Sequence, residues 1–589
     1  MNHVGIRTAP AGALVFAASL LAALTVMAAE SGDFRNIKNG ARIYEHGYCD
    51  QPYVVVAPDC TWICVFTTSA GHEGTRSQYV VSTTSTDLGK SWSEPVPIEP
   101  PSEREASWAM PLMTDYGRIY AFYVFNGDNV RTLPNGKKMR ADTHGWYCCK
   151  YSDDNGKTWS ERRRLPMRVT ACDRGNEFEG KVQYFWGIGK PITHEGTAWF
   201  AFTKLARYFL EGGEGWFYRS DNVLTEKDPA KVTWELLPEG DHGLRHPDFG
   251  SVQEEQNLVP LSNGDLYCMY RTTQGFPAEA YSRDGGRSWT LPEIARYANG
   301  RPFKHPRACP RIWRCSNGKF LFWHHNHGGT NFNDRNPAWI SGGIERDGRI
   351  LWSQPEILFY GDDLSYQTGR FSYPDLVEID GRFWVTTTQK TQATIHEVDP
   401  ALFNAVWSQG EIREVVQKGL VLNLPEASPG EVDMPTLPSL KDGGFTIDFW
   451  ATFENLDPGQ IILDSRSDVE GIAVSTAANG TIRIDFSDGA KSGGWDSDPG
   501  MVTCGKRHHI AIIVDGGPNI ITFVVDGVVC DGGTQRQYGW GRFDPAIEDV
   551  NGGNKAKTAS SLNGTIETLR IYDRYLLNSE AIANYHAGG

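Results

Sequence analysis

Carboxylate, phenol and guanidinium side chains occur at the ends of several strand-like runs of this 589-residue chain. Glu255 opens one run, Arg271 closes the run that follows it, and Tyr373 stands at the start of another. A carboxylate accepts protons, and a guanidinium group binds anions through paired hydrogen bonds. These residue types indicate proton transfer and the binding of an anionic group, at a site that the fold must assemble from distant segments.

Three turns of one form indicate the elements that position these residues. The form is Ser-x-Asp-x-Gly-x-Ser/Thr-Trp, and it begins at Ser85, Ser152 and Ser282. In such a turn the carboxylate caps nearby backbone donors, and the glycine adopts the left-handed conformation. Weaker copies begin at Ser220 and Ser341, so the starts recur every 60 to 70 residues or so. An internal repeat of about this length fits one four-stranded blade of a propeller.

The repeat predicts an all-β chain built from two domains. We assign residues 35–405 to a six-bladed β-propeller, whose last blade is closed by strands from both ends of the domain. Asp399-Pro400 and several later prolines mark a joint, and we assign residues 406–417 to a linker. A second set of strand runs follows over residues 418–589.

The C-terminal strand runs resemble those of a laminin-G-like, concanavalin-like jelly roll, a β-sandwich. The resemblance rests on FTIDFWATF from residue 445, HHIAIIVDGG from residue 508 and LNGTIETLRIYDRYL from residue 562. Modules of this kind often bind glycans, and others only pack against a neighbouring domain. Both interpretations stay open here.

Composition and charge exclude several kinds of partner. The formal net charge is −15, and an acidic chain without a basic stripe argues against nucleic acid. Residues 1–29 have a short basic start, an apolar run and small residues before Glu30, which predicts a cleaved signal peptide and a secreted or periplasmic protein. An uncleaved anchor is the alternative. No other run is apolar enough to span a membrane, so no span remains after signal removal.

The eleven cysteines are an odd number, and several lie inside strand-like runs. We expect most of them to be buried thiols. A disulfide between Cys504 and Cys530 is an alternative that the sequence leaves open.

The repeated turns resemble the Asp-boxes of the sialidase superfamily. Asp-boxes also occur in proteins that are not enzymes, so the resemblance implies a fold and leaves the site to be argued from other residues. It implies a retaining glycoside hydrolase with a tyrosine nucleophile, because a neutral phenol is repelled less than a carboxylate by the acid group of the sugar. In the family a glutamate takes the phenol proton, three arginines hold the sugar carboxylate, and an aspartate is the general acid.

Four residues match these family landmarks. Tyr373 matches the nucleophile, with Pro374 where the family has a serine. Glu255 matches the base that activates the phenol, and Arg271, at the end of the next strand, matches the second arginine. Arg335, which follows a His-rich strand end, matches the third.

The first arginine and the general acid depart from the family pattern. Asp50 stands where the first arginine belongs, and we expect Arg76 or Arg370 to neutralise it. With two arginines left, a uronate, a sulfate or an unusual ulosonic acid is an alternative to sialic acid. The loop at residues 69–76 has no aspartate, so Glu73 is the predicted acid and needs a raised pKa; His72 and Asp50 are the alternatives.

Two further segments supply candidate substrate contacts. Arg174 and Arg307 each follow one of the repeated turns, where propeller loops line the central mouth, and a structural role is the alternative for both. No metal centre is predicted, because no Cys-x-x-Cys pair or His-Glu-x-x-His run is present. His324, His325 and His327 cannot all face one ion from an extended loop. No cofactor is expected, and a structural calcium ion in the C-terminal domain is left open.

The sequence thus favours a secreted, exo-acting glycoside hydrolase that removes a terminal acidic sugar from a glycan or polysaccharide. One alternative is a polysaccharide lyase or a hydrolase acting on another uronic or sulfated glycan. The other is a carbohydrate-binding or adhesion protein without catalytic activity.

Overall fold

The computed structural model describes residues 32–365, 369–441 and 443–588. The predicted signal peptide, residues 1–29, lies outside the described residues. Strands dominate the described part, which confirms the all-β class. Its helices are α1 (Ala171–Arg174), α2 (Pro400–Trp407) and α3 (Asn578–Ala587), with the 3-10 turns η1 (Ile37–Asn39) and η2 (Ala478–Gly480).

Residues 41–398 form six antiparallel sheets of four or five strands within the described residues. The first contains β2 (Tyr48–Val56), β3 (Trp62–Ser69), β4 (Tyr79–Ser85) and β5 (Val96–Glu99). The second contains β6 (Ala106–Met113), β7 (Ile119–Phe125), β8 (Trp146–Ser152) and β9 (Arg163–Arg164). The third contains β10 (Tyr184–Trp186), β11 (Ile192–His194), β12 (Thr197–Leu205), β13 (Glu214–Ser220) and β14 (Glu235–Leu237).

The remaining three sheets follow in chain order. The fourth contains β15 (Gln253–Pro260), β16 (Leu266–Thr272), β17 (Pro277–Ser282) and β18 (Glu293–Ile294). The fifth contains β19 (Arg311–Arg314), β20 (Phe320–His324), β21 (Ala338–Arg346), β22 (Arg349–Trp352) and β23 (Glu356–Phe359). The sixth contains β24 (Ser372–Ile379), β25 (Arg382–Thr388), β26 (Ala393–Val398) and the N-terminal β1 (Ala41–Tyr44).

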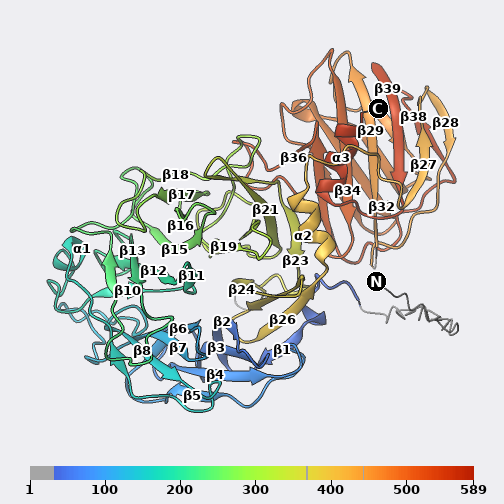
Figure 1. Ribbon diagram of the computed structural model, residues 1–589. Helices are drawn as coiled ribbons and strands as arrows, with labels where there is room; N and C mark the ends of the chain where they lie inside the picture. Colours follow the sequence, from blue (N-terminus) through green and yellow to red (C-terminus); the bar gives the residue numbers. More distant parts are fainter. Residues whose placement is uncertain (1–31, 366–368, 442, 589) are drawn as a thin grey trace, which may run out of the picture. The chain divides into compact units, whose positions relative to one another are not determined.

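The sheets pack against one another in succession. Strand β15 contacts β12 on one side and β19 on the other, and β2 contacts both β6 and β24. The N-terminal β1 pairs with β26, so strands from both ends of this region share the sixth sheet (Figure 1). A six-bladed propeller requires this kind of succession and this kind of closure.

The first strands of four sheets share one irregularity. In each of β2, β6, β15 and β24, two residues stand opposite a single residue of the partner strand, which is a β-bulge. The first residue of each bulge has a positive φ: Gln51 (57°), Trp108 (64°), Glu255 (57°) and Tyr373 (46°). Left-handed backbone at residues other than glycine is strained, and such strain clusters at functional sites.

The three repeated turns share a hydrogen-bond pattern. In the first turn, Ser85 Oγ donates to Asp87 Oδ1 at 2.8 Å, and Gly89 N donates to Ser85 Oγ at 3.0 Å. The carboxylate also accepts from the backbone of Ser91 at 3.0 Å. The turns at Ser152 and Ser282 repeat these bonds, so each motif fixes its own loop locally.

The two weaker copies differ from each other. At Ser220, Asn222 takes the place of the aspartate and accepts from Thr233 N at 3.0 Å. At Ser341 the prediction is wrong, because this residue lies inside β21 and pairs with Phe322 of β20.

Helix α2 corrects the predicted boundary between the domains. Asp399 caps this helix by accepting from Ala401 N at 2.9 Å, and Pro400 occupies its first position, a combination typical of helix starts. Phe403 and Trp407 are buried against the fifth and sixth sheets. The linker predicted at 406–417 thus begins inside this helix, which ends at Trp407.

The C-terminal region forms two antiparallel sheets around its own apolar core. One sheet contains β27 (Leu420–Leu424), β29 (Gly444–Phe453), β34 (Arg507–Asp515), β35 (Ile520–Val525), β36 (Val528–Val529), β37 (Gly541–Arg542) and β39 (Gly564–Tyr572). The other contains β28 (Gly430–Asp433), β30 (Ile461–Asp464), β31 (Glu470–Ala477), β32 (Thr481–Asp488), β33 (Ser492–Asp496) and β38 (Lys555–Thr558). Alternate residues of both sheets point into the core, as in a β-sandwich.

The Cys504–Cys530 disulfide that the sequence left open is not formed. All eleven cysteines lie in the described part of the chain, and each is a free thiol. Cys530 is buried in the sandwich core while Cys504 is exposed on a loop.

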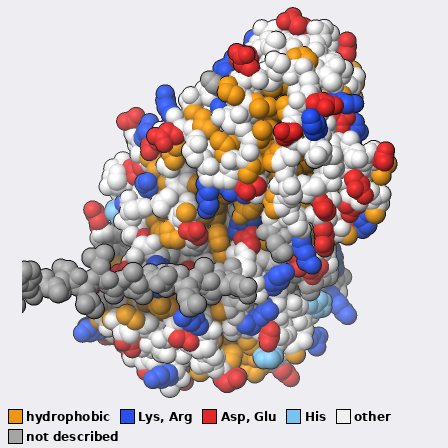
Figure 2. All heavy atoms as spheres, turned by 90° about the vertical axis from the view of Figure 1, so that its right-hand side faces the viewer, with side chains coloured by type: hydrophobic (Ala, Val, Ile, Leu, Met, Phe, Trp, Pro, Cys, Tyr) orange, Lys and Arg blue, Asp and Glu red, His pale blue; other side chains and the backbone are white. Residues whose placement is uncertain are grey.

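Acidic and basic side chains are interspersed over the face drawn in Figure 2. Within the described residues, no helix is long and apolar enough to cross a membrane.

Candidate active site

One cavity brings together six of the nine residues that the sequence singled out. Its lining includes Glu73, Glu255, Arg271, Arg307, Arg335 and Tyr373. These side chains come from loops and strand ends of the first, fourth, fifth and sixth sheets. Segments separated by up to 300 residues therefore meet at one place, on the side where the bulged strands begin.

Tyr373 and Glu255 form the centre of the cavity. The Tyr373 hydroxyl donates to Glu255 Oε1 at 2.9 Å, and both residues are buried. Burial, with the Glu255 carboxylate beside it, raises the pKa of the Tyr373 phenol well above its usual value. Burial also raises the pKa of the Glu255 carboxyl, and Arg271 opposes that effect. A more basic carboxylate is better matched to accept the phenol proton.

The bulge in β15 ties Glu255 to the neighbouring sheet. The backbone N–H of Glu255 has no ladder partner at the bulge and donates instead to Thr203 Oγ1 of the neighbouring sheet, at 2.9 Å. Trp108, at the equivalent position of β6, donates in the same way to Thr67 Oγ1 at 2.8 Å and also lines the cavity. At these two bulges, a threonine from the preceding sheet thus satisfies the backbone donor that the bulge frees.

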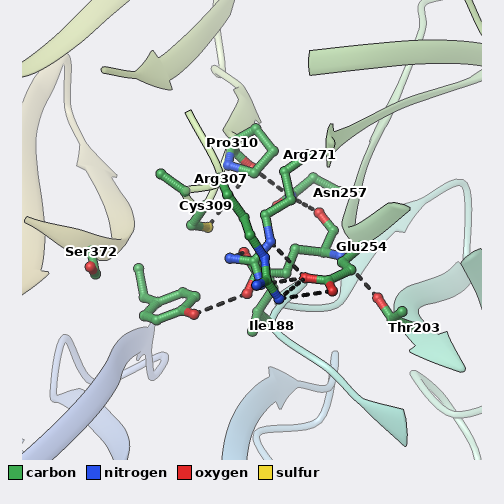
Figure 3. Close-up of polar contacts among 12 residues, drawn as sticks. Ile188, Thr203, Glu254, Asn257, Arg271, Arg307, Cys309, Pro310 and Ser372 are labelled. Atoms are coloured by element: carbon green, nitrogen blue, oxygen red, sulfur yellow. Dashed lines mark hydrogen bonds and ion pairs between the residues drawn. The ribbon is translucent and has the colours of Figure 1, made fainter. Parts of the chain in front are cut away.

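Glu254, the residue before Glu255, organises two arginines. Arg271 Nε donates to Glu254 Oε2 at 2.9 Å, and Arg307 Nη2 lies 3.1 Å from Glu254 Oε1. Figure 3 shows Arg271 and Arg307 converging on Glu254. Arg271 Nη1 also lies 2.8 Å from Glu255 Oε2. One buried carboxylate therefore holds both guanidinium groups in place while one of them also contacts the candidate base.

Arg335 is held beside the strand that carries Tyr373. Its Nη1 donates to Ser372 Oγ at 2.9 Å, and its Nη2 donates to the Arg307 carbonyl at 2.8 Å. Among the described residues, its buried Nε has no hydrogen-bond partner. Burial lowers the pKa of Arg335 from its usual value. A buried cation with an unsatisfied donor is suited to receive an anionic group of a ligand.

Glu73 lies in the cavity among three cations. Its carboxylate is 3.0 Å from Arg140 Nη2, 3.1 Å from Lys390 Nζ and 3.6 Å from Arg370 Nη2. The three cations outweigh burial and hold the pKa of the carboxyl well below its usual range. The raised pKa that a general acid requires is therefore absent in this state of the site, and the sequence-based expectation for Glu73 needs correction on this point.

Asp50 does not line the cavity. It is fully buried, accepts from the Tyr48 hydroxyl at 2.8 Å and forms an ion pair with Lys390. Burial raises the pKa of its carboxyl against the effect of Lys390. The neutralising cation is thus Lys390, whereas Arg76 is exposed and Arg370 faces Glu73. Asp50 is thus enclosed by its partners and lies away from the cavity lining, and its contact with substrate stays a prediction.

Two other candidates lie away from the cavity lining. Arg174, the last residue of α1, pairs with Asp241, and both side chains are about half exposed. His72 is exposed, and its carbonyl oxygen accepts from Thr75 within the same loop. The structure places both in surface roles. The histidines 324, 325 and 327 are buried, and among the described residues no group of three or more ligating side chains could hold a metal ion.

Sequence reasoning missed Arg140 and Lys390, and it considered Arg370 only as a neutraliser of Asp50. All three line the cavity together with aromatic side chains, namely Trp108, Trp186, Phe209 and Phe332. Arg140 comes from the second sheet and is held by Asp142 at 2.6 Å. None of these residues stands next to a repeated turn, so no local motif marks them. Trp108 differs from the others, because it stands at a β-bulge with a positive φ, as Glu255 and Tyr373 do.

Comparison with protein-family models identifies both parts of the chain. Residues 113–385 match the BNR repeat-like domain, and residues 427–583 match the Concanavalin A-like lectin/glucanases superfamily. The chain thus combines a BNR repeat-like region with a C-terminal concanavalin A-like domain. This confirms the resemblance that the repeated turns and the C-terminal strands predicted.

Solved structures with similar backbones include several sialidases. A Trypanosoma rangeli sialidase in complex with sialic acid is 13% identical, with a TM-score of 0.41, and the match covers 92% of this chain and 94% of that chain. The intramolecular trans-sialidase from Ruminococcus gnavus, in complex with oseltamivir carboxylate, is 14% identical, with a TM-score of 0.45 and coverage of 62% and 98%. A search of curated protein sequences finds no match.

Proposed function

We propose that the protein is a secreted, exo-acting glycoside hydrolase that removes a terminal acidic sugar from glycans, and that its six small sheets are the blades of a propeller. The observation that carries the proposal is the buried hydrogen bond from Tyr373 to Glu255, with Arg271 on the other carboxylate oxygen. A phenol, a matched base and several guanidinium groups in one cavity are the parts that a tyrosine nucleophile needs.

The proposed mechanism is a double displacement with retention. Glu255 accepts the phenol proton while Tyr373 Oη attacks the anomeric carbon, and the bond from that carbon to the leaving oxygen breaks. A water molecule then attacks the same carbon and gives a proton to the Glu73 carboxylate, Tyr373 Oη leaves, and Glu255 returns the phenol proton to it. Arg271, whose Nη1 lies 2.8 Å from Glu255 Oε2, stabilises the carboxylate form in the resting state.

The anionic group of the sugar is proposed to bind Arg335 and Arg271, with Arg307 and Lys390 nearby. Support comes from the unsatisfied Nε of Arg335 and from the position of Lys390 between Asp50 and Glu73. Lys390 supplies the positive charge that the sequence lacks at the first arginine position. Guanidinium groups bind carboxylates in two-point contacts, and an ammonium group acts as a point charge.

For the leaving oxygen, we propose that the substrate prepares Glu73 as the acid. An incoming sugar carboxylate competes for Lys390 and Arg370, two of the three cations that now keep Glu73 ionised. Losing these partners and gaining a neighbouring negative charge both raise the pKa of a carboxyl. Glu73 would then be protonated only when an acidic sugar is bound, and it would donate its proton to the departing oxygen.

The proposal is tested with aryl glycosides of sialic acid, other ulosonic acids and uronic acids. We expect release of the aryl alcohol from at least one acidic sugar, with an NMR-resolved first product of retained anomeric configuration. The 2,3-difluoro analogue of that sugar should form an adduct on the Tyr373 peptide, located by mass spectrometry. An unsaturated product would show a lyase instead, and glycan binding without turnover of any substrate would show a binding protein.

A further inference from the structure

A second cavity adjoins the candidate active site. Phe332, Arg335 and Arg370 line both cavities. The rest of the second lining comes from the loop around Arg335, from Leu364, Ser365 and Gly369, and from the C-terminal sandwich, including Trp495, Tyr538, Trp540 and Arg542. We propose that this cavity binds the sugar on the leaving side of the cleaved bond, so that the jelly roll completes the substrate site; this inference rests on the proposed function.

The loop that carries Arg335 links the two cavities residue by residue. Arg335 is buried, and its guanidinium group lies beside the strand of Tyr373. Its neighbours Asp334 and Asn336 line the second cavity but not the first. A sugar held by Arg335 through its anionic group therefore has its next sugar within reach of the second cavity.

The sandwich residues are fixed against this loop by direct hydrogen bonds. The Tyr538 hydroxyl donates to Asp334 Oδ2 at 2.6 Å, and Trp540 Nε1 donates to the Asn326 carbonyl at 3.0 Å. Arg542 Nη2 donates to the Asn336 carbonyl at 2.9 Å. Three alternate residues of one short segment, Tyr538, Trp540 and Arg542, thus hold the second cavity in a defined shape. A pre-formed site binds its ligand with a smaller entropic cost.

Aromatic rings and mixed charges make this cavity suitable for a neutral sugar. Tyr538 and Trp540 pack edge to face, with ring centroids 4.9 Å apart, and the half-buried Trp495 donates to the Gly539 carbonyl at 3.1 Å. The C–H face of a pyranose packs on such rings, while its hydroxyls bond to nearby polar groups. Asp334 and Arg542 offer an acceptor and a donor of opposite charge, and the two other cations of this lining, Arg335 and Arg370, are shared with the first cavity, where Arg370 lies 3.6 Å from Glu73.

The contrast between the cavities defines the ligand class. The first carries arginines 271, 307 and 335 with Lys390, and it suits an anion. Apart from Arg335 and Arg370, which line both cavities, the second carries aromatic rings with one acid, Asp334, and one arginine, Arg542. A glycan with an acidic terminal sugar on a neutral galactose-like or glucose-like sugar matches both.

The test uses Tyr538→Ala in the full-length protein, with Tyr585→Ala as the matched control, because Tyr585 is an aromatic residue of the same domain that lines neither cavity. We expect kcat/KM for a trisaccharide, an acidic sugar on lactose, to fall about tenfold in Tyr538→Ala. For the aryl glycoside of the same acidic sugar, kcat/KM should change less than about twofold. Equal losses on both substrates, or no loss on the trisaccharide, would overturn the inference.

Two further measurements separate this inference from the proposed function and from misfolding. Tyr538→Phe keeps the ring and should keep most of the trisaccharide activity, with a melting temperature near that of the unaltered protein. Lactose alone should bind the Tyr373→Phe protein by saturation-transfer NMR, and Tyr538→Ala in that background should abolish the signal. If no acidic glycoside is hydrolysed, the proposed function fails while the lactose signal still decides the inference; absence of that signal refutes it.

Discussion

The ammonium group of Lys390 lies 4.6 Å from the centroid of the Tyr373 ring. The same group pairs with Asp50 and lies 3.1 Å from Glu73 Oε2. Lys390 lies just beyond the end of β25. It thus contacts the candidate nucleophile Tyr373, the buried Asp50 and the candidate proton donor Glu73. A cation over an aromatic face is attractive, and it also favours negative charge developing on the phenol oxygen.

Replacing Lys390 by methionine should reduce activity and stability together. Loss of the cation leaves Asp50 buried and unpaired, which lowers the free energy of unfolding by about 3 kcal/mol. We expect kcat/KM on the acidic aryl glycoside to fall about a hundredfold, since a charge near the reacting centre is lost. Urea unfolding and steady-state kinetics measure the two effects.

The double variant Asp50→Asn with Lys390→Met separates these effects. Removing both charges should recover most of the lost unfolding free energy, because no unpaired ion remains buried. Activity should stay as low as in Lys390→Met. If activity returned with stability, Lys390 would be only a structural partner of Asp50.

Removing the phenol hydroxyl should abolish turnover. Tyr373→Phe takes away the attacking oxygen, so kcat should fall by at least about a thousandfold. Tyr123→Phe is the matched control, because Tyr123 also donates from a buried position to a glutamate, Glu99 at 2.7 Å, but lines no part of the cavity. Comparable activity of Tyr373→Phe and Tyr123→Phe would exclude a tyrosine nucleophile.

Glu73→Gln should discriminate between leaving groups. A natural glycoside needs a proton on its departing oxygen, so kcat should drop about a hundredfold. An aryl glycoside with an acidic phenol leaves without that proton, and its kcat should change only a few-fold. Equal effects on both substrates would assign Glu73 to binding and would contradict its role as the acid.

The framework of this chain was predictable because its signals are local. The turns at Ser85, Ser152 and Ser282 specify their own hydrogen bonds, and Tyr373 stands next to a recognisable strand start. The cations around Glu73 were not predictable, since Arg140 and Lys390 reach it from other sheets with no motif beside them. Asp399-Pro400 carries a helix-start signal, which the structure bears out in α2. Because further prolines follow in the sequence, the sequence alone favours a joint between domains at this pair.

Glu279 should make stability depend on pH. Burial raises the pKa of its carboxyl to about 7, although the Tyr267 hydroxyl donates to it at 2.6 Å. Because the folded state keeps this proton to a higher pH than the unfolded state does, stability falls as pH rises from about 4.5 to 7. Glu279→Gln should remove on the order of 2 kcal/mol of that fall, measured by urea unfolding at pH 5 and pH 8. An unchanged pH dependence would contradict the prediction.

Asp284→Ala should weaken the fold without affecting catalysis. The carboxylate accepts from Ser282 Oγ at 2.9 Å and from the Ser288 backbone at 2.9 Å, on a loop outside the cavity lining. Losing these bonds should lower the free energy of unfolding by about 1 kcal/mol. The kcat/KM of the variant, measured well below its melting temperature, should equal that of the unaltered protein; a specific loss of activity would place this turn in the site.

In each of the four bulged strands, the residues that pair with the neighbouring strand are distinct from the residue at the bulge. At Gln51, Trp108, Glu255 and Tyr373 the extra residue is left out of the ladder. At three of these positions, Trp108, Glu255 and Tyr373, the side chain lines the cavity. Exchanging the bulge residues that line the cavity therefore offers a direct route to redesigning the reaction while the pairing of the strands stays unchanged.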